Sequence, residues 1–303
     1  MKLINPKVEQ WHCGYTLPEI WSHIAKCARV CYQSEPRGNA ETDEEFVKRV
    51  ILRNHSFEEI AYNRELQLKL HLSTLEHGTI YLFFPYDKRD ENIEFRINDK
   101  FSRINVDDDD NVYITTNMRY IVEYGLVDNC LEFICSPKQF HTLRTTFNII
   151  TDIGVARELD RHRSHSISEE SSRFCNYSKD KFGKELTFIK PEWFNSEFID
   201  KDGHWDSNTF YRSTKQSIEE DAYLGNLLRV ESNYLKLIKN GWTPQQARQI
   251  LPLNTKVQTI HTAFNDDWEE FIKLRADACS GSVHPNMKVI ANGIKDLMSE
   301  ANA

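Results

Sequence analysis

Residues 160–173 read Asp-Arg-His-Arg-Ser-His-Ser-Ile-Ser-Glu-Glu-Ser-Ser-Arg, the most polar stretch of the chain. It holds three arginines, two histidines, five serines and two glutamates around one apolar residue, Ile167. Guanidinium groups bind phosphate through forked donors, while hydroxyls and carboxylates can orient a ring that forms hydrogen bonds. The composition therefore predicts a site for a phosphorylated ligand that carries such a ring. A solvated helix face or loop remains the alternative on composition alone.

The segments on either side of this stretch predict both strands and helices. Just before it, Phe147-Asn-Ile-Ile150 is typical of a strand, and Ile153–Leu159 indicates the start of a helix. A buried strand is expected at 79–84, because Thr-Ile-Tyr-Leu-Phe-Phe is short, apolar and rich in β-formers. Apolar residues at helical spacing predict helices at 17–32, 43–53, 215–239, 243–251, 266–275 and 285–299.

The character of the chain changes between residues 86 and 139. The acidic run Asp107–Asp110 lies between charged, strand-like pieces such as 112–116, and a run of this kind is usually a solvated loop. No internal repeat and no long Gly/Ser or Pro linker divides the sequence. We therefore expect one domain over 1–303 with an insertion at 86–139.

Composition indicates a globular cytoplasmic protein. Of the 303 residues, 40% are apolar, and no stretch approaches the roughly 18 consecutive apolar residues of a membrane helix. The first residues lack the apolar core of a signal peptide, and the seven cysteines are scattered without a Cys-x-x-Cys pair, so we expect free thiols and no metal centre. The net charge of −8 argues against a protein that coats nucleic acid, but a few converging arginines could still hold a small anion.

The polar stretch also carries a specific pattern. Arg161-His162-Arg163, followed by seven residues and then Ser171, resembles the signature of the flavin-dependent thymidylate synthases. Ser166, Glu169 and Arg173 also fall where that family has the same residues. Together with the helices and strands above, the resemblance implies an α+β fold with a central, mostly antiparallel sheet flanked by helices and an inserted β-rich segment.

Four further segments resemble motifs of the same family. They are Ala28-Arg-Val-Cys-Tyr32, His71-Leu-Ser-Thr-Leu-Glu-His77, Pro244-Gln-Gln-Ala-Arg248 with Leu251-Pro-Leu-Asn254, and Phe271-Ile-Lys-Leu-Arg275. Each has a structural alternative. The first could be ordinary helix core, and the arginines of the last two could lie on helix surfaces. In the second, Ser73 could be an N-cap with Glu76 closing a capping box, while a zinc site at His71 and His77 lacks further ligands nearby.

The resemblance implies conversion of dUMP to dTMP, with methylenetetrahydrofolate as carbon donor and NADPH-reduced FAD as hydride carrier. It assigns FAD contacts to Cys31, His71, Ser73, Glu76, Arg161, His162, Arg163 and Asn265. It assigns dUMP contacts to Glu158, Arg161, Glu169, Glu170, Ser171, Ser172, Arg173, Arg248 and Arg275. Arg275 is also the expected catalytic residue, because a guanidinium stays charged beside the anion that forms when N3 of the pyrimidine ionises.

Ser171 is expected to position the substrate rather than attack it, because no general base stands at a readable spacing. Family members are homotetramers whose active sites combine residues of several subunits, so the same assembly is expected here. The other expected partners are small molecules only, with neither nucleic acid nor membrane among them.

The sequence departs from the family pattern mainly on the flavin side. Glu158, Ser168 and Phe174 replace the usual Gln, Asn and Tyr. Asp266 and Glu270 stand where a basic residue and an amide are usual, only Asn265 remains of the Asn-x-Arg segment, Cys279 replaces a His, and a short insertion precedes Pro285. Two alternatives stay open. One is a non-catalytic nucleotide-binding or regulatory homologue that has lost flavin, and the other is an RNA or DNA binder that uses 161–173 to contact phosphates.

Overall fold

The computed structural model describes residues 1–33, 41–89, 100–194, 199–205, 217–279 and 281–301. Its centre is a four-stranded sheet in the order β2-β6-β9-β7, in which every neighbouring pair is antiparallel. The strands are β2 (Lys7–Trp11), β6 (Arg144–Asp152), β9 (Lys256–Phe264) and β7 (Ser166–Glu169). The expected α+β fold with a mostly antiparallel central sheet is confirmed.

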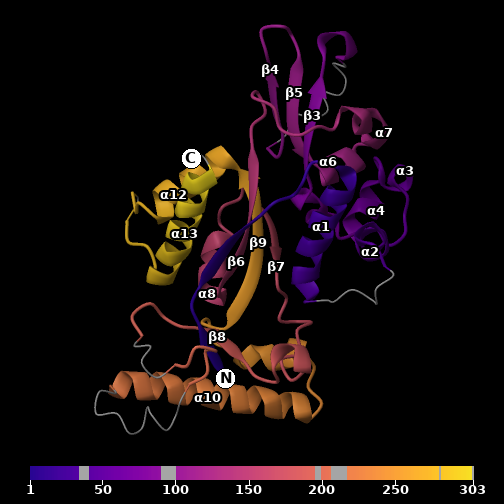
Figure 1. Ribbon diagram of the computed structural model, residues 1–303. Coiled ribbons are helices and arrows are strands. Elements are labelled where there is room, and N and C mark those ends of the chain that lie inside the picture. Colours follow the sequence, from indigo (N-terminus) through magenta and orange to yellow (C-terminus); the bar gives the residue numbers. More distant parts are fainter. Residues whose placement is uncertain (34–40, 90–99, 195–198, 206–216, 280, 302–303) are drawn as a thin grey trace.

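Helices cover both faces of the central sheet (Figure 1). On one face, α12 (Asn265–Arg275) and α13 (Pro285–Ala301) pack Trp268, Phe271 and Ile290 against Phe147 and Ile149 of β6. On the other, α1 (Leu17–Tyr32) buries Cys27 and Val30 against Ile260 of β9. Phe147 and Ile149 of β6 thus bury one face of the sheet and Ile260 of β9 contributes to the other, which holds the sheet in the middle of the molecule.

A second sheet extends from the central one, at the top of Figure 1. It has the antiparallel order β3-β5-β4, with β3 (Thr79–Phe84), β5 (Val112–Asn117) and β4 (Arg103–Val106). The helices around it are α2 (Asp43–Val50), α3 (Phe57–Ile60), α4 (Arg64–Lys69), α6 (Met118–Glu123) and α7 (Val127–Cys130). The residues expected to be β-rich therefore pair with the strand at 79–84. That they form an insertion stays a prediction.

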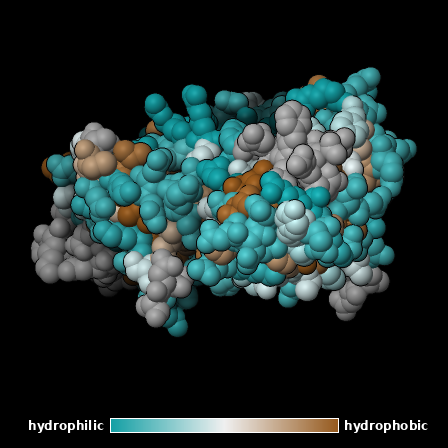
Figure 2. Space-filling view, turned by 90° about the horizontal axis from the view of Figure 1, so that it is seen from above, coloured by the Kyte–Doolittle hydropathy of each residue, from teal (hydrophilic) through white to brown (hydrophobic). Residues whose placement is uncertain are grey.

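The acidic run lies in the turn between β4 and β5. Asp107 Oδ1 accepts the backbone N–H groups of Asp109 and Asn111 at 3.0 and 2.9 Å, and Asp108, Asp109 and Asp110 are exposed. The run is thus the expected solvated loop, in which one carboxylate closes the turn. Seen from above, most of the surface is hydrophilic, with small separate hydrophobic patches (Figure 2).

The third layer lies below the central sheet (Figure 1). β1 (Lys2–Ile4) pairs in parallel with β8 (Thr187–Ile189), and the long helix α10 (Ile218–Lys239) packs beneath them. The chain then forms α11 (Pro244–Ala247) and a 3-10 helix, η5 (Arg248–Ile250), before it enters β9. The remaining short elements are α8 (Ile153–Leu159) and the 3-10 helices η1 (Leu72–His77), η2 (Tyr86–Lys88), η3 (Leu131–Phe133) and η4 (Asp180–Phe182).

Most of the expected elements are confirmed, with three corrections. The helix expected at 43–53 ends at Val50, and the following turn places Arg53 and Asn54 at positive φ. The helix expected at 243–251 is not continuous, because it tightens into η5 at Arg248. The capping box considered at Ser73 is wrong, since η1 begins at Leu72 with His71 as its N-cap residue. Residues 215 and 216 of another expected helix lie outside the described residues. Within the described part of the chain, none of the helices combines the length and apolar character that a bilayer crossing requires.

Candidate functional site

The polar stretch 160–173 folds as an exposed turn, the strand β7 and a second turn, so it is not a helix face and only part of it is loop. Asp152 caps α8 by accepting the N–H of Val155 at 2.8 Å, and the chain turns after Leu159 before it enters β7. Along β7, Ser166 and Ser168 are buried while Ile167 and Glu169 are half-buried. The buried serines can lie in the central sheet because their hydroxyls have hydrogen-bond partners, Arg144 for Ser166 and His77 for Ser168.

A fully buried histidine fixes η1 against this strand. His77 forms hydrogen bonds through both ring nitrogens, from Nδ1 to Thr262 Oγ1 at 2.8 Å and from Nε2 to Ser168 Oγ at 2.9 Å. Burial lowers the pKa of His77 well below its ordinary value, so the ring is neutral. Because both nitrogens bind hydroxyls, His77 is an element of structure and does not suit the zinc alternative. The described residues contain no group of three or more potential metal ligands.

The end of β7 opens into a cavity of about 230 Å³, which we call the serine–arginine cavity. Its polar walls are Arg157, Glu169, Glu170, Ser171, Ser172 and Arg248, together with Lys256. Arg248 Nη1 donates to Ser172 Oγ at 3.4 Å across 76 positions of sequence. The structure therefore brings together two motifs that were linked only by the resemblance. Arg157 and Lys256 were not among the expected site residues.

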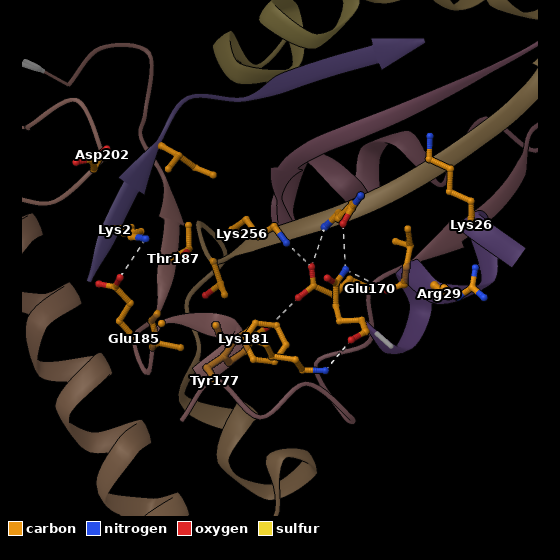
Figure 3. Close-up of a pocket in the computed structure, with 18 residues that line it drawn as sticks. Lys2, Lys26, Arg29, Glu170, Tyr177, Lys181, Glu185, Thr187, Asp202 and Lys256 are labelled. Atoms are coloured by element: carbon orange, nitrogen blue, oxygen red, sulfur yellow. Dashed lines mark hydrogen bonds and ion pairs between the residues drawn. The ribbon is translucent and has the colours of Figure 1, made fainter. Parts of the chain in front are cut away.

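A buried ion pair forms one wall of this cavity. Glu170 accepts a hydrogen bond from Lys256 Nζ at 2.6 Å, from the N–H of Gln258 at 3.2 Å and from Tyr177 Oη at 3.3 Å. The same three side chains, Glu170, Tyr177 and Lys256, also line a larger cavity of about 630 Å³, which we call the basic cavity (Figure 3). Glu170 is thus an internal counter-ion that holds Lys256 between the two cavities.

Glu169 is the second carboxyl of the serine–arginine cavity. Burial raises its pKa to about 7, and the negative charge of Asp160 adds to the increase, which Arg157 partly offsets. A carboxyl with this pKa is part protonated at neutral pH, so it can donate as well as accept a hydrogen bond. This property suits the recognition of a ring carbonyl beside a phosphate.

A second cluster joins α8 and α12. Arg275 Nε donates to His162 Nε2 at 3.3 Å, and Arg275 Nη1 lies 3.5 Å from Glu158 Oε2. Burial and the charge of Arg275 lower the pKa of His162 to about 4, so the ring is a neutral acceptor. None of these three residues lines the serine–arginine cavity of the described chain.

The other expected arginines of the 160–173 stretch lie on the surface. Arg161 and Arg163 are exposed, and Arg173 is exposed with Nε donating to Gln245 at 3.2 Å. Within one chain, therefore, Ser171, Ser172 and Arg248 come together, whereas Arg161, Arg163 and Arg275 do not join them.

Some of the residues expected to contact FAD are exposed and could contact a dinucleotide, whereas others are already paired within the chain. His71 and Ser73 are exposed on η1, where hydroxyl and imidazole groups can face a ligand, and Arg161 and Arg163 add exposed cationic donors. Glu76 is buried and accepts from Arg119 Nη1 at 2.6 Å, so its carboxylate is already paired.

Cys31 and Asn265 are held by other parts of the chain. Cys31 is half-buried, its carbonyl accepts the N–H of Ser171, and burial raises the pKa of its thiol. Asn265 fits a ligand contact less well, because its Oδ1 already accepts the Thr145 hydroxyl at 2.7 Å and its neighbour Asp266 is exposed and acidic. A basic group from β4 lies close to Asp266, with Arg103 Nη2 3.8 Å from Asp266 Oδ2.

Comparison with known proteins gives one family and a few distant relatives. A flavin-dependent thymidylate synthase of Thermosipho melanesiensis is 28% identical over 142 residues, which are 46% of this chain and 57% of that protein. This chain therefore spans a little over half the length of that relative. A UMP/dUMP methylase, PolB, from Streptomyces cacaoi is similar in two solved structures. With 5-Br dUMP bound, the TM-score is 0.37 and the identity 18%, over 52% of this chain and 66% of that one. With 5-Br UMP bound, the TM-score is 0.42 and the identity 14%, over 99% of this chain and 92% of that one.

The family match is the broadest of these similarities in sequence. Residues 98–301 match the family described as thymidylate synthase complementing protein. The span holds the 160–173 stretch, Arg248 and Arg275, and it begins within the segment expected as an insertion. It leaves out Cys31, His71, Ser73 and Glu76, whose roles therefore rest on the short motifs alone. Since the match covers more than half of the sequence, the chain belongs to the thymidylate synthase complementing protein family.

Proposed function

We propose that this protein is a flavin-dependent thymidylate synthase, a methyltransferase that converts dUMP to dTMP. In this proposal methylenetetrahydrofolate donates the carbon, and FAD reduced by NADPH carries the hydride. The observation that carries the proposal is the serine–arginine cavity, in which Ser171, Ser172 and Arg248 from distant motifs meet. Membership of the family supports the same reaction.

The charges around the cavity suit a nucleoside monophosphate. Glu170 and Lys256 compensate each other, which leaves the guanidinium groups of Arg157 and Arg248 to attract a phosphate near the two serine hydroxyls. Glu169, part protonated near neutral pH, would bind a carbonyl of the uracil ring. Further proposed dUMP contacts are the exposed Arg161 and Arg173 and, from the second cluster, Glu158 and Arg275.

Arg275 is the proposed catalytic residue. Its Nε and Nη1 are held by His162 and Glu158, so the guanidinium has a fixed orientation and its Nη2 can face the pyrimidine. A preorganised cation lowers the free energy of the anion that forms when N3 ionises. Bound FAD would supply the hydride, and the residues proposed to hold it are Cys31, His71, Ser73, Glu76, Arg161, His162, Arg163 and Asn265, of which Asn265 fits least.

We also propose that the protein is a homotetramer with shared active sites. The reason is geometric, since Arg161, Arg163 and Arg275 do not line the serine–arginine cavity of their own chain. A second copy placed over the cavity would supply these arginines. The proposed location is the cytoplasm, and the proposed partners are the small molecules dUMP, folate and NADPH.

Ligand binding tests the phosphate assignment directly. By calorimetry, Arg248→Met should weaken dUMP binding roughly tenfold to a hundredfold, because one charged hydrogen bond is lost, while leaving deoxyuridine binding unchanged. The control is Arg64→Met, which removes an exposed arginine from α4. Equal affinity of the wild type for dUMP and deoxyuridine would contradict a phosphate site in this cavity.

A non-catalytic homologue that has lost flavin is the second candidate function. Two observations favour it, namely the engaged amide of Asn265 and the exposed acid at Asp266. Protein that stays colourless after incubation with FAD, yet binds dUMP, would establish this alternative. A flavin absorbance band that co-purifies with the protein would exclude it. The nucleic-acid alternative is disfavoured by the net charge of −8, and salt-sensitive retention of RNA or DNA on filters would be needed to revive it.

A further inference from the structure

A third cavity, of about 280 Å³, is distinct from the serine–arginine cavity proposed for dUMP. The segment from Gln10 to Tyr15, which leads out of β2, forms one side of it. The first residues of β3 and β6 form the other side, including Thr79, Tyr81 and Arg144. We call it the Arg144 cavity. It shares no lining residue with the serine–arginine cavity or the basic cavity.

Arg144 is a buried cation whose hydrogen-bond acceptors are neutral. Its side chain is only 8% exposed. Nη1 donates to the carbonyl of Glu76 at 3.1 Å and to Thr79 Oγ1 at 3.3 Å, and Nη2 donates to Ser166 Oγ at 3.3 Å. Nε is buried and has no partner among the described residues. A guanidinium held this way keeps its charge without a counter-ion, an arrangement that costs free energy unless an anion joins it.

Burial and the positive charge of Arg144 affect the pKa values of the neighbouring groups. Burial lowers the pKa of Arg144 itself, and it also lowers the pKa of His77, to which the charge of Arg144 contributes further. Glu76 lies within the same field, but its carboxylate is paired with Arg119 at 2.6 Å. Asp267 also acts on Arg144 electrostatically, but no carboxylate is among the hydrogen-bond acceptors of the Arg144 guanidinium in the described chain.

The rest of the cavity wall combines aromatic rings with polar side chains, among them Gln10, His12 and Thr146. Trp11, Tyr15 and Tyr81 line it, and the rings of the two tyrosines are 6.1 Å apart in an edge-to-face arrangement. Tyr81 Oη accepts the backbone N–H of Arg144 at 3.1 Å, so its own proton can be donated to a bound group. A cavity of this size, just below the usual range for drug-sized ligands, admits a small molecule.

We propose that the Arg144 cavity binds a small oxyanion carried on a flat apolar body, such as an aromatic carboxylate or an aryl phosphate. The anionic group meets the Arg144 guanidinium and the Tyr81 hydroxyl, and the ring lies against Tyr15 and Trp11. The site is separate from the proposed dUMP site and does not depend on thymidylate synthase activity.

Three aromatic probes of similar shape separate the contribution of the negative charge to binding from that of the ring. Benzoate and phenyl phosphate should raise the thermal unfolding midpoint of the whole chain, whereas benzamide, the neutral counterpart of benzoate, should not. Whichever of the two anions binds more tightly shows whether the cavity prefers a carboxylate or a phosphate ester. Saturating dUMP should leave benzoate affinity unchanged, because the two cavities share no lining residue. Equal shifts with benzoate and benzamide, no shift with either anion, or competition by dUMP would overturn the proposal.

Variants assign the binding to this cavity. Arg144→Lys should weaken benzoate roughly tenfold or more, since a charged fork is replaced by a point charge. Because Arg144 also ties β6 to β3 and β7, a second variant leaves it in place. Tyr15→Ala removes a ring that is 47% exposed and should weaken benzoate roughly fivefold. The matched control is Tyr86→Ala, which removes an exposed tyrosine outside the cavity. Wild-type affinity in both Arg144→Lys and Tyr15→Ala would refute the site.

Discussion

Lys256 Nζ lies 2.6 Å from Glu170 Oε2, and this ion pair stands between the serine–arginine cavity and the basic cavity. The Glu170 side chain is 1% exposed and that of Lys256 is 19% exposed. The two charges compensate each other in a largely buried setting, so the loss of either one should be measurable as a loss of stability.

Removal of one partner should destabilise the fold. We expect Glu170→Gln to lower the free energy of unfolding by roughly 3 kcal/mol, because Lys256 is left as an unpaired, largely buried cation. The measurement is urea denaturation of the single variants Glu170→Gln and Lys256→Met and of the double variant. The double variant should lose clearly less than the sum of the two single losses. Additive losses would show that the two groups do not interact.

Glu169 should make stability depend on pH. Its pKa is about 7 in the folded chain and near 4.5 when unfolded, so the folded state holds the proton longer. The resulting stabilisation is complete below pH 4.5 and is lost as the pH rises to about 7. Glu169→Gln should therefore be more stable than the wild type at pH 8, by up to about 3 kcal/mol, and equal to it at pH 4.5. An equal difference at both pH values would contradict the raised pKa.

Buried histidines should produce the opposite dependence. Burial lowers the pKa of His23 to about 4 and that of His261 to about 3, so the unfolded chain takes up protons first as the pH falls. Their stabilisation is present above pH 6.5 and is lost between pH 6.5 and about 3. Denaturation midpoints of His261→Phe should fall less steeply with acid than those of the wild type. His55→Gln, at a half-exposed surface site, is the control and should match the wild type.

Shared active sites predict complementation between two inactive variants. Arg248→Ala damages the phosphate cavity, and Arg275→Ala damages the cluster on α12. When the two are co-expressed, assemblies should contain some sites with both arginines intact, so dTMP formation should return in part. A mixture as inactive as either variant alone, in an assembly shown by light scattering to contain both chains, would mean that each chain forms its own site.

Local pattern was enough to predict most of the elements. Apolar spacing located α1, α10, α12 and α13, and β-forming residues located β3. The helix expected at 243–251 failed because Pro252 restricts Leu251 to extended backbone and the chain tightens into η5 before it. A hydrophobic repeat of 3.6 residues cannot show where an α-helix changes into a 3-10 helix.

From the sequence, the candidate site was predictable only at residues that belong to short family motifs. The serines after β7 and Arg248 were found, because both lie in motifs of the family. Lys256 was missed, since its partner Glu170 is 86 positions away and only the pairing of β7 with β9 brings them together. Arg275 does not line the cavity of its own chain, and this depends on how α12 packs against the sheet rather than on sequence spacing.

The most direct test of the proposed function is tritium release from 5-tritiated dUMP in the presence of FAD, NADPH and methylenetetrahydrofolate. The wild type should release tritium and form dTMP only when all three are present, and Arg275→Ala should abolish release while the protein still folds. Protein that binds both dUMP and flavin but releases no tritium under these conditions would contradict the account.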